Sequence, residues 1–313
     1  MSQTQHLDVI VAGLALADVI GRPVEFNKPP KRGALKLIDS ITLTTGGNVS
    51  NVGIDLARLG FRVGAITRVG NDPIGRFVIQ YYKTFGIDTE GVIIDAKAQT
   101  SATIVGVDKK GERTFLHTRG CMKNFRAHDI LTRIPLIRKA SILAVGYLGL
   151  LPETERDFKP LFRAIKHETQ TTILLDTAAS PRVTGKELRG FLPYVDYFIP
   201  SYEEAAGLTG CKTPEAIVKA FFDAGAPHIV GVKLAEKGCY ISDGRHGEFV
   251  KSRRVRNVVD ATGAGDAFVA GFVAATLKGL DPFKAARVAN SVAASCVSAV
   301  GASTAIREFD SYL

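Results

Sequence analysis

Two hydrophobic patterns alternate along most of this chain. Short continuous apolar runs, typical of strands buried on both faces, occur at residues 9–12, 141–145, 172–175, 194–199 and 228–233. Between and after them lie segments whose composition or apolar spacing is helical, at residues 48–59, 73–86, 153–168, 202–208, 214–224, 263–278 and 282–297. Regular alternation of strand and helix predicts an α/β fold with a mainly parallel sheet and helices on both faces.

Residues 20–45 interrupt this pattern. They contain several prolines and charges, followed by an alternating apolar run at 37–44. Further along, strands are expected at 101–107 and 113–118, joined by a hairpin turn at Asp108–Gly111. We expect these segments to form a small sheet, a lid made of about 14–45 and 92–120, on a single domain that spans 1–313.

Two shorter regions complete the expected elements. Residues 62–69 have the composition of one more strand of the main body. Residues 239–256 are expected to hold further short strands before the last two helices. No internal repeat or low-complexity segment is present.

Bulk composition is that of a globular protein, with 46% hydrophobic and 23% charged residues. No apolar run reaches the roughly 18 residues that a membrane helix needs. The first residues lack a basic region followed by an apolar core, and the four cysteines form no CxxC pair. These features predict a cytoplasmic protein with reduced thiols and no membrane partner.

The net charge of +9 raises the question of a nucleic-acid partner. The basic residues of the chain lie in short, separate stretches at 28–36, 119–126 and 251–256. They do not alternate with aromatic residues as they do on a nucleic-acid-binding surface. An anionic small substrate such as a nucleotide explains a positive cleft equally well. We therefore expect no nucleic-acid partner.

The turn at Asp260–Asp266 is the clearest candidate for chemistry. It links the apolar pair Val258-Val259 to a helical segment, and glycines at 263 and 265 leave its backbone open to a ligand. Free amides and the helix dipole make such a helix start an anion site. Asp266 places a carboxylate at its mouth, which is costly unless it has a chemical role or serves as an ordinary helix cap.

A second turn with glycines lies near the N-terminus. Gly46 and Gly47 precede a predicted helix that carries Asn51, and Asp18 follows the first strand. Ligands of open α/β sheets bind beyond the carboxyl ends of the strands, so both turns are expected at one edge. Asp18 and Asn51 are suited to hold sugar hydroxyls, and the glycines let a sugar lie against the backbone. The alternatives are a turn carboxylate and a helix cap.

Together these stretches resemble the ribokinase-like (PfkB) family of sugar and nucleoside kinases. Residues 260–266, DATGAGD, are similar to the family signature DTxGAGD, and Gly46-Gly47 with Asn51 resembles its GGxxxN signature. The resemblance implies a three-layer α/β/α fold with a mainly parallel central sheet and a small β-sheet lid. It also implies an ATP-dependent kinase in which Asp266 is the general base and Gly263, Ala264 and Gly265 form the anion hole.

On the nucleotide side the resemblance is looser. The family pattern Asn-x-x-Glu falls on residues 201–204, where Glu204 is retained to act on Mg²⁺ through water but Ser201 replaces the asparagine. Ser201 also suits a helix cap. The resemblance implies ATP contacts at Lys233, Gly238 and Asn290. Lys233 is equally well explained as a strand-end charge, and Asn290 as a satisfied core residue.

A monovalent cation is a further implication of the family. Asp260 and the loop at 299–303, with Gly301 at its centre, match the region where relatives bind K⁺. Carbonyl ligands leave little trace in a sequence, so K⁺ activation rests on the resemblance alone.

The identity of the acceptor is left open by the residues. The stretch 145–149 holds no carboxylate, which argues against ribose, while Arg119, Lys123 and Arg126 suit an acidic or phosphorylated sugar or a solvated loop. A small sugar or sugar acid is the leading expectation.

The alternatives are a nucleoside kinase with stacking aromatics at Phe26, Phe115 or Phe125, and a catalytically silent sugar-binding regulatory protein. An oxidoreductase is disfavoured because GxGxxG is absent. The exposed lid edges predict a homodimer.

Overall fold

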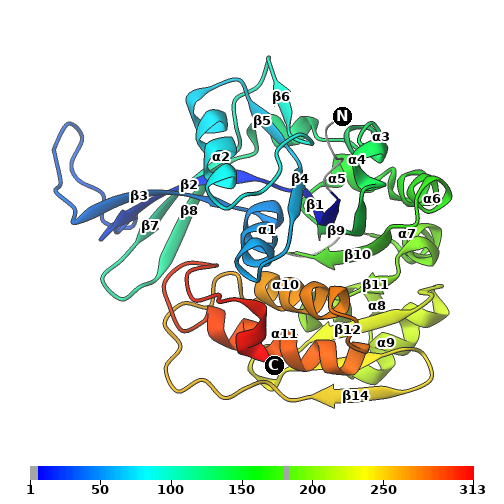
Figure 1. Ribbon diagram of the computed structural model, residues 1–313. Helices are drawn as coiled ribbons and strands as arrows, with labels where there is room; N and C mark the ends of the chain where they lie inside the picture. Colours follow the sequence, from blue (N-terminus) through cyan, green and yellow to red (C-terminus); the bar gives the residue numbers. More distant parts are fainter. Residues whose placement is uncertain (1–5, 179–182) are drawn as a thin grey trace.

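The computed structural model describes residues 6–178 and 183–313. Its central sheet has eight strands in the order β14-β13-β12-β11-β10-β9-β1-β4, and parallel pairing runs from β12 to β4 (Figure 1). At one edge of the sheet, β13 pairs antiparallel with both β12 and β14. The strands are β1 (Leu7–Gly13), β4 (Val63–Ile66), β9 (Ala140–Leu148), β10 (Thr172–Thr177), β11 (Tyr197–Phe198), β12 (Ile229–Lys233), β13 (Cys239–Ser242) and β14 (Gly247–Val250).

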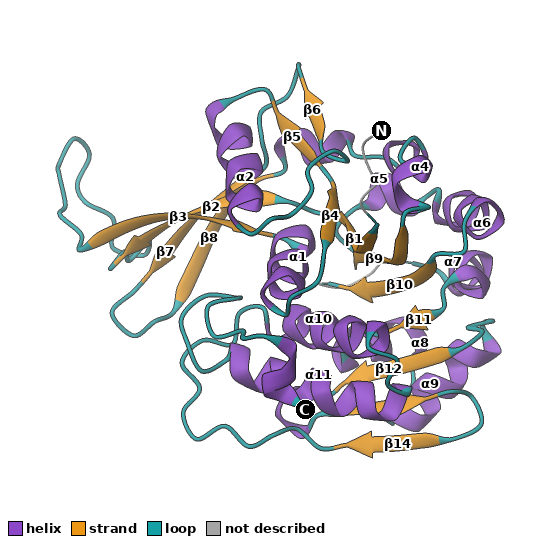
Figure 2. Cartoon of the chain, viewed as in Figure 1, coloured by secondary structure: helices purple, strands orange, loops and turns teal. Residues whose placement is uncertain are grey.

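Helices cover both faces of this sheet (Figure 2). One hydrophobic cluster joins one face to α1, α2, α10 and α11, and a second joins the other face to α3, α4, α6, α7 and α9. The three-layer α/β/α architecture expected from the sequence is therefore confirmed. The helices are α1 (Asn48–Arg58), α2 (Pro73–Thr84), α3 (Ala127–Leu131), α4 (Ile134–Ile137), α5 (Pro152–Glu155), α6 (Phe158–Glu168), α7 (Gly185–Phe191), α8 (Tyr202–Thr209), α9 (Pro214–Asp223), α10 (Ala264–Leu277) and α11 (Pro282–Cys296).

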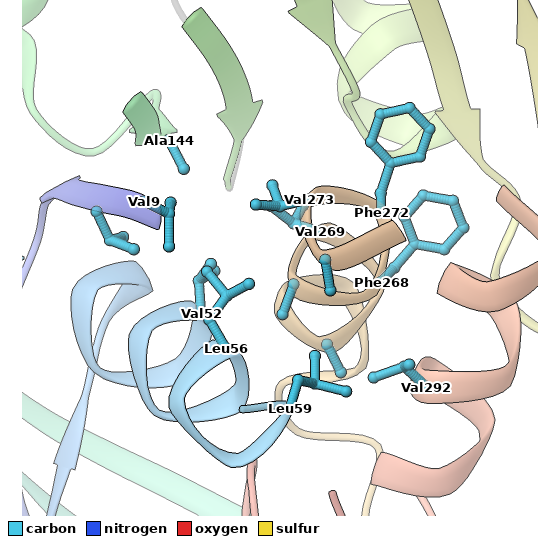
Figure 3. Packing of buried hydrophobic residues seen from close by; sticks show 14 of the residues in the cluster. Val9, Val52, Leu56, Leu59, Ala144, Phe268, Val269, Phe272, Val273 and Val292 are labelled. Atoms are coloured by element: carbon cyan, nitrogen blue, oxygen red, sulfur yellow. The ribbon is translucent and has the colours of Figure 1, made fainter. Parts of the chain in front are cut away.

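Helix α10 lies at the centre of the first layer. Figure 3 shows its Val269 and Val273 beside Val52 and Leu56 of α1. On its other side α11 comes so close that a Cβ on Gly271 would lie 2.9 Å from the Ala289 Cα. Because α10 is buried along most of its length, its N-terminal turn has a fixed position beside α1.

The lid is a separate four-stranded sheet in the order β3-β2-β7-β8, projecting to the left in Figure 1. Directly opposite residues of neighbouring strands share a face. One row contains Asp18, Thr103 and His117, and the adjacent row on the opposite face contains Leu43, Val19, Ile104 and Leu116. The lid strands are β2 (Leu16–Arg22), β3 (Ser40–Gly46), β7 (Ala102–Val107) and β8 (Arg113–Thr118).

The lid boundaries and one predicted strand need correction. Residues 93–95 form β6 (Ile93–Asp95), which pairs with β5 (Arg68–Gly70), so the second part of the lid sheet begins at 102. The strand expected at 62–69 divides at Thr67 into β4 and β5. There the Thr67 hydroxyl donates to the carbonyl of Gly13 at 2.8 Å, and the chain leaves the central sheet to pair with β6.

Other predicted elements are shorter than expected. The run at 194–199 gives only β11, because a 3-10 turn containing Pro193 occupies 192–194. The helix expected at 153–168 divides into α5 and α6. Residues 251–256 form no strand, since β14 is the last strand of the sheet and no further strand pairs with them. Across 6–178 and 183–313, no helix has the length and apolar character needed to cross a membrane.

Candidate active site

The carboxylate of Asp266 lies in the first turn of α10 and is buried. The Asn51 side-chain amide donates to Oδ2 at 2.8 Å. The Tyr147 hydroxyl lies 2.8 Å from Oδ1 and 2.7 Å from Oδ2 and donates to this carboxylate. Three elements, α1, β9 and α10, therefore fix one acidic group. Sequence reasoning expected Asp266 and Asn51 at one sheet edge but did not include Tyr147.

Burial raises the pKa of Asp266 above the ordinary aspartate value. Hydrogen bonds from Asn51 and Tyr147 and the charge of Lys233 act in the opposite direction, because they stabilise the ionised form. A buried carboxylate with a raised pKa that is still held by donors is suited to accept a proton from a neighbouring hydroxyl. This combination makes Asp266 a strong candidate for a general base.

The turn before α10 has the backbone shape that the glycines predicted. Gly263 has a φ of 78°, and a Cβ there would lie 2.5 Å from the Ala302 Cβ. Gly263 is the N-cap of α10, so Ala264 and Gly265 lie in the first turn, where amides have no intrahelical partner. The Ala264 amide donates to the Ala261 carbonyl at 3.3 Å. The Gly265 amide and the helix dipole make this helix start suited to an anion next to Asp266.

A cavity of about 560 Å³ opens on one side of this turn. Most of its lining is apolar, including Val255, Val258, Phe268 and Val297. The structure brings five sequence candidates together on its wall: Lys233, Gly238, Ala264, Gly265 and Asn290. A large apolar cavity that ends at a helix N-terminus suits a ligand with a flat ring and an anionic tail.

Lys233 points toward the anion site. Its Nζ lies 2.6 Å from Oδ1 of Asp176, and a Cβ on Gly265 would lie 3.6 Å from the same nitrogen. Asp176, at the end of β10, was not identified from the sequence. Burial raises its pKa to about 6, against the opposing charge of Lys233. Lys233 is therefore more than an exposed strand-end charge, because a buried partner orients it beside the glycine turn.

Asn290 and Gly238 both contact the backbone at the end of β14, on the wall of this cavity. The Asn290 side-chain NH₂ donates to the carbonyls of Val250 at 3.0 Å and Lys251 at 3.3 Å. Asn290 is thus a satisfied buried residue, and its side-chain oxygen is the group available to a ligand. A Cβ on Gly238 would lie 2.0 Å from the Val250 carbonyl oxygen, so only glycine fits there.

Glu204 does not line the 560 Å³ cavity. It lies in the first turn of α8, where the Thr177 hydroxyl donates to Oε2 and the Ser201 amide donates to the same oxygen at 3.3 Å. Ser201 is the N-cap residue of α8. The replacement of the family's asparagine by serine therefore keeps the helix start intact.

Asp18 lies on the lid face that is turned toward a second cavity of about 360 Å³. Thr103, Phe115, His117 and Arg119 line this cavity from the lid side. Burial raises the pKa of Asp18, while a hydrogen bond from Thr103 lowers it. A Cβ on Gly46 would lie 2.6 Å from an Asp18 carboxylate oxygen, so Gly46 makes room for this carboxylate.

Gly47 has a different role from Gly46. It is the N-cap residue of α1 with a φ of 87°, and a Cβ there would lie 2.4 Å from the carbonyl oxygen of Leu14. Gly47 is therefore required by the close approach of its own backbone to the β1–β2 connection.

Asp260 connects the glycine turn to the lid. Its carboxylate pairs with Arg113 of β8 and accepts from the amides of Gly301 at 2.9 Å and Thr262 at 3.0 Å. Burial alone would raise the pKa of Asp260, but these donors and the Arg113 charge outweigh it and lower the pKa. Since this carboxylate is occupied, a cation beside it would depend on carbonyl oxygens of the neighbouring loops.

Comparison with known proteins agrees with this geometry. A model of the pfkB family carbohydrate kinase matches residues 6–308. This chain belongs to the pfkB family of carbohydrate kinases. It is accordingly a phosphotransferase with an alcohol group as acceptor. The resemblance suggested by the two glycine signatures is thereby confirmed.

Relatives of this pfkB-family chain include named sugar kinases. The chain is 31% identical over 286 residues to a 2-dehydro-3-deoxygluconokinase of Bacillus subtilis (strain 168), covering 86% of this chain and 85% of that protein. It is 29% identical over 289 residues to a 5-dehydro-2-deoxygluconokinase of Geobacillus kaustophilus (strain HTA426), covering 87% and 82%. An Arabidopsis thaliana ribokinase complexed with ribose and ATP has the same fold, with a TM-score of 0.83, 23% identity and 98% of each chain covered.

Replacing Tyr147 with phenylalanine should move the acid limb of the kcat–pH profile to higher pH. A general base must be ionised to accept a proton, so with Asp266 in that role activity should fall as the pH drops through its folded-state pKa. Loss of the Tyr147 hydrogen bond, which lowers that pKa, raises it further. The measurement is kcat against pH for sugar phosphorylation. Tyr82→Phe, which removes a buried hydroxyl bonded to Ser50, is the control and should leave the limb in place. An unmoved limb in the Tyr147 variant would contradict this role of Tyr147.

Proposed function

We propose that this chain transfers the γ-phosphoryl group of ATP to a hydroxyl of a small sugar or sugar acid. The observation that carries the proposal is the buried Asp266 carboxylate, held by Asn51 and Tyr147 at the start of α10. Gly265, the preceding residue, lines the 560 Å³ cavity, and Lys233 lies on the same wall. A base fixed beside a helix start that opens into a large cavity can act on an acceptor hydroxyl while the helix start binds a phosphate.

The proposed reaction uses the groups in place. An acceptor hydroxyl beside Asp266 gives its proton to the carboxylate as its oxygen attacks the γ-phosphorus, and the bond to the β-phosphate oxygen breaks. The first-turn amides of α10 stabilise charge on the transferred group, and Lys233 adds a positive charge beside them. The products are the phosphorylated sugar and ADP, and Asp266 then releases its proton to water.

ATP and Mg²⁺ are the expected small-molecule partners. A solved relative with the same fold, named a putative ribokinase II of E. coli, is in complex with ATP and Mg²⁺. Within the described residues, no group of three acidic, histidine or cysteine side chains is placed to hold a metal. Mg²⁺ would therefore be held mainly by phosphate oxygens and water, with Glu204 in reach through water, and would neutralise phosphate charge. K⁺ would use carbonyls near Asp260 and Gly301.

The smaller cavity favours a sugar acid among the acceptors. Arg119 lines it beside His117 and Thr103, whereas Lys123 does not line it and Arg126 donates to nearby backbone carbonyls. An arginine can bind a carboxylate through two parallel hydrogen bonds. The relatives named as kinases of dehydro-deoxygluconate compounds are consistent with such an acceptor.

Fewer features of the structure favour a nucleoside kinase or a catalytically silent sugar-binding protein. Of the three aromatics considered for a nucleoside, only Phe115 lines the smaller cavity. Phe26 packs against Gly106 and Phe125 is fully buried. A silent sugar-binding protein would be expected to have lost the base or the glycine turn, and both are present with the geometry described above.

Asp266→Asn should lower turnover by about 10²–10⁴-fold, because the variant cannot accept the proton, while ATP binding persists. The measurement is ATP consumption with a panel of pentoses, hexoses, sugar acids and nucleosides, with and without K⁺, alongside calorimetry with ATP. Asp223→Asn, an exposed residue of α9, is the matched control. Near-normal turnover by Asp266→Asn would refute the base assignment, and wild type that binds sugars without any turnover would favour a regulatory protein.

Arg119→Gln should raise KM for a sugar acid on the order of tenfold, the effect of losing about one charge-assisted hydrogen bond. KM for the matching neutral sugar should change little. Lys123→Gln is the control and should leave both values unchanged. If KM for the sugar acid and KM for the neutral sugar changed equally, or if neither changed, Arg119 would not be the carboxylate-binding group. The kinase proposal would be unaffected by that result.

We also expect a homodimer formed through the outer lid face. The row of Leu43, Val19, Ile104 and Leu116 exposes apolar side chains, with Leu43 44%, Ile104 53% and Leu116 56% exposed. Such a patch on a thin sheet favours burial against a second copy. Sedimentation equilibrium should give a dimer for the wild type and a monomer for Ile104→Asp. Ile94→Asp, exposed on β6, should remain dimeric. A monomeric wild type at micromolar concentration would rule out this interface.

A further inference from the structure

The loop that follows β14 is unusually basic. Residues 251–256 contain Lys251, Arg253, Arg254 and Arg256, and the loop runs toward the glycine turn without forming a strand. Together with α11 and the C-terminal turn at Phe309–Tyr312, it borders a pocket of about 350 Å³ that is open to solvent. Four arginines line this pocket: Arg253, Arg254, Arg256 and Arg307.

These arginines have no counter-charge. Among the residues that the structure describes, none of the four guanidinium groups forms an ion pair with a carboxylate, and no acidic side chain lines the pocket. By contrast, Arg287 on the same helix α11 pairs with Glu248 at 2.7 Å. Gathering four like charges around one hollow is unfavourable in itself, and a bound anion would reverse that cost.

The hydroxyl groups of the pocket are largely committed to the protein. Ser295 donates to the carbonyl of Ala305 at 2.9 Å, Ser311 to that of Glu308 at 2.6 Å, and Ser291 to that of Arg287 at 3.1 Å. Recognition therefore falls to the guanidinium groups. Their planar forks bind phosphate through paired hydrogen bonds, so the chemistry of the pocket favours phosphate over a neutral ligand.

The pocket shares a wall with the large cavity that we assign to ATP. Arg253, Arg254 and Val255 of the loop, with Ala294 of α11, line both hollows. Arg256 and Arg307 line the 350 Å³ pocket but not the nucleotide cavity, and Arg256 also lines an adjoining hollow of about 510 Å³. A ligand that draws the arginines together would therefore act on one side of the nucleotide cavity.

We propose that this pocket binds a small polyphosphorylated molecule and that its binding is coupled to that of the nucleotide through residues 253–255. The pocket is open to solvent but small, and it is bounded by the loop, α11 and the C-terminal turn. Its short span favours a small ligand over an extended nucleic-acid strand, which needs a continuous basic groove with stacking aromatics. The site is distinct from the anion site at the start of α10, so it does not depend on the proposed sugar substrate.

Inorganic tripolyphosphate is the probe for this site. The full chain, saturated with a non-hydrolysable ATP analogue to fill the nucleotide cavity, is titrated with tripolyphosphate by calorimetry. Wild type should bind one equivalent. The double variant Arg256→Ser with Arg307→Ser should bind at least tenfold more weakly, because both residues line this pocket and neither lines the nucleotide cavity. Arg163→Ser, a basic residue of α6 in another surface hollow, is the control and should bind as wild type.

Coupling is measured separately. The dissociation constant of the ATP analogue should change when tripolyphosphate is present, and by thermodynamic linkage the change should vanish in the double variant. If the double variant bound tripolyphosphate as tightly as wild type, or if Arg163→Ser weakened tripolyphosphate binding equally, the proposed site would be wrong. If tripolyphosphate left the affinity for the ATP analogue unchanged, the proposed coupling would be wrong. A single-stranded oligonucleotide that binds more tightly than tripolyphosphate, and loses affinity in the same double variant, would replace the small-ligand site with a nucleic-acid surface.

Discussion

Burial of the Asp266 carboxylate beside the open end of α10 is the constraint on which the rest of the site depends. Removing a carboxylate from water is costly unless donors replace the water. Here Asn51 of α1 and Tyr147 of β9 provide those donors. Both elements must therefore be in register with α10. That register comes from the packing of α1, α10 and α11 and from the absence of a side chain at Gly271.

Two ion pairs lie in this region. Lys233 is paired with Asp176 beside the 560 Å³ cavity, and Arg113 is paired with Asp260 at the start of the glycine turn. The second pair joins β8 of the lid to the loop before α10, so the lid position and the backbone of the anion site are linked. A charged group that enters either cavity would act on these pairs at short range and in a partly buried setting, where electrostatic interactions are strong.

The positive net charge of the chain also has a local explanation. Composition alone predicts basic residues in short, separate stretches, or a positive cleft that binds an anionic small substrate such as a nucleotide. The fold brings Arg307, near the C-terminus, beside Arg253, Arg254 and Arg256. These residues are about fifty positions apart in the chain, so their proximity has no signature in the local sequence. Every charged residue that lines this pocket is an arginine, whereas the 560 Å³ cavity is also lined by Glu236.

The sequence by itself determined the fold class and the two glycine turns. Buried parallel strands and helices have distinct hydrophobic patterns, and a turn that needs a positive φ at Gly263 is written directly as glycine. It also predicted that Asp266 and Asn51 lie together, which their hydrogen bond confirms, whereas Asp18 lies on β2 of the lid. Tertiary structure alone decided that Tyr147 and Asp176 lie beside Asp266 and Lys233, since each is near the end of an ordinary apolar strand. It likewise decided that Gly47 and Gly238 make room for backbone, and that Asp260 is occupied by Arg113. The reason is physical: local patterns report what a residue needs from its own segment, while hydrogen-bond partners and shared cavities depend on segments brought together by packing.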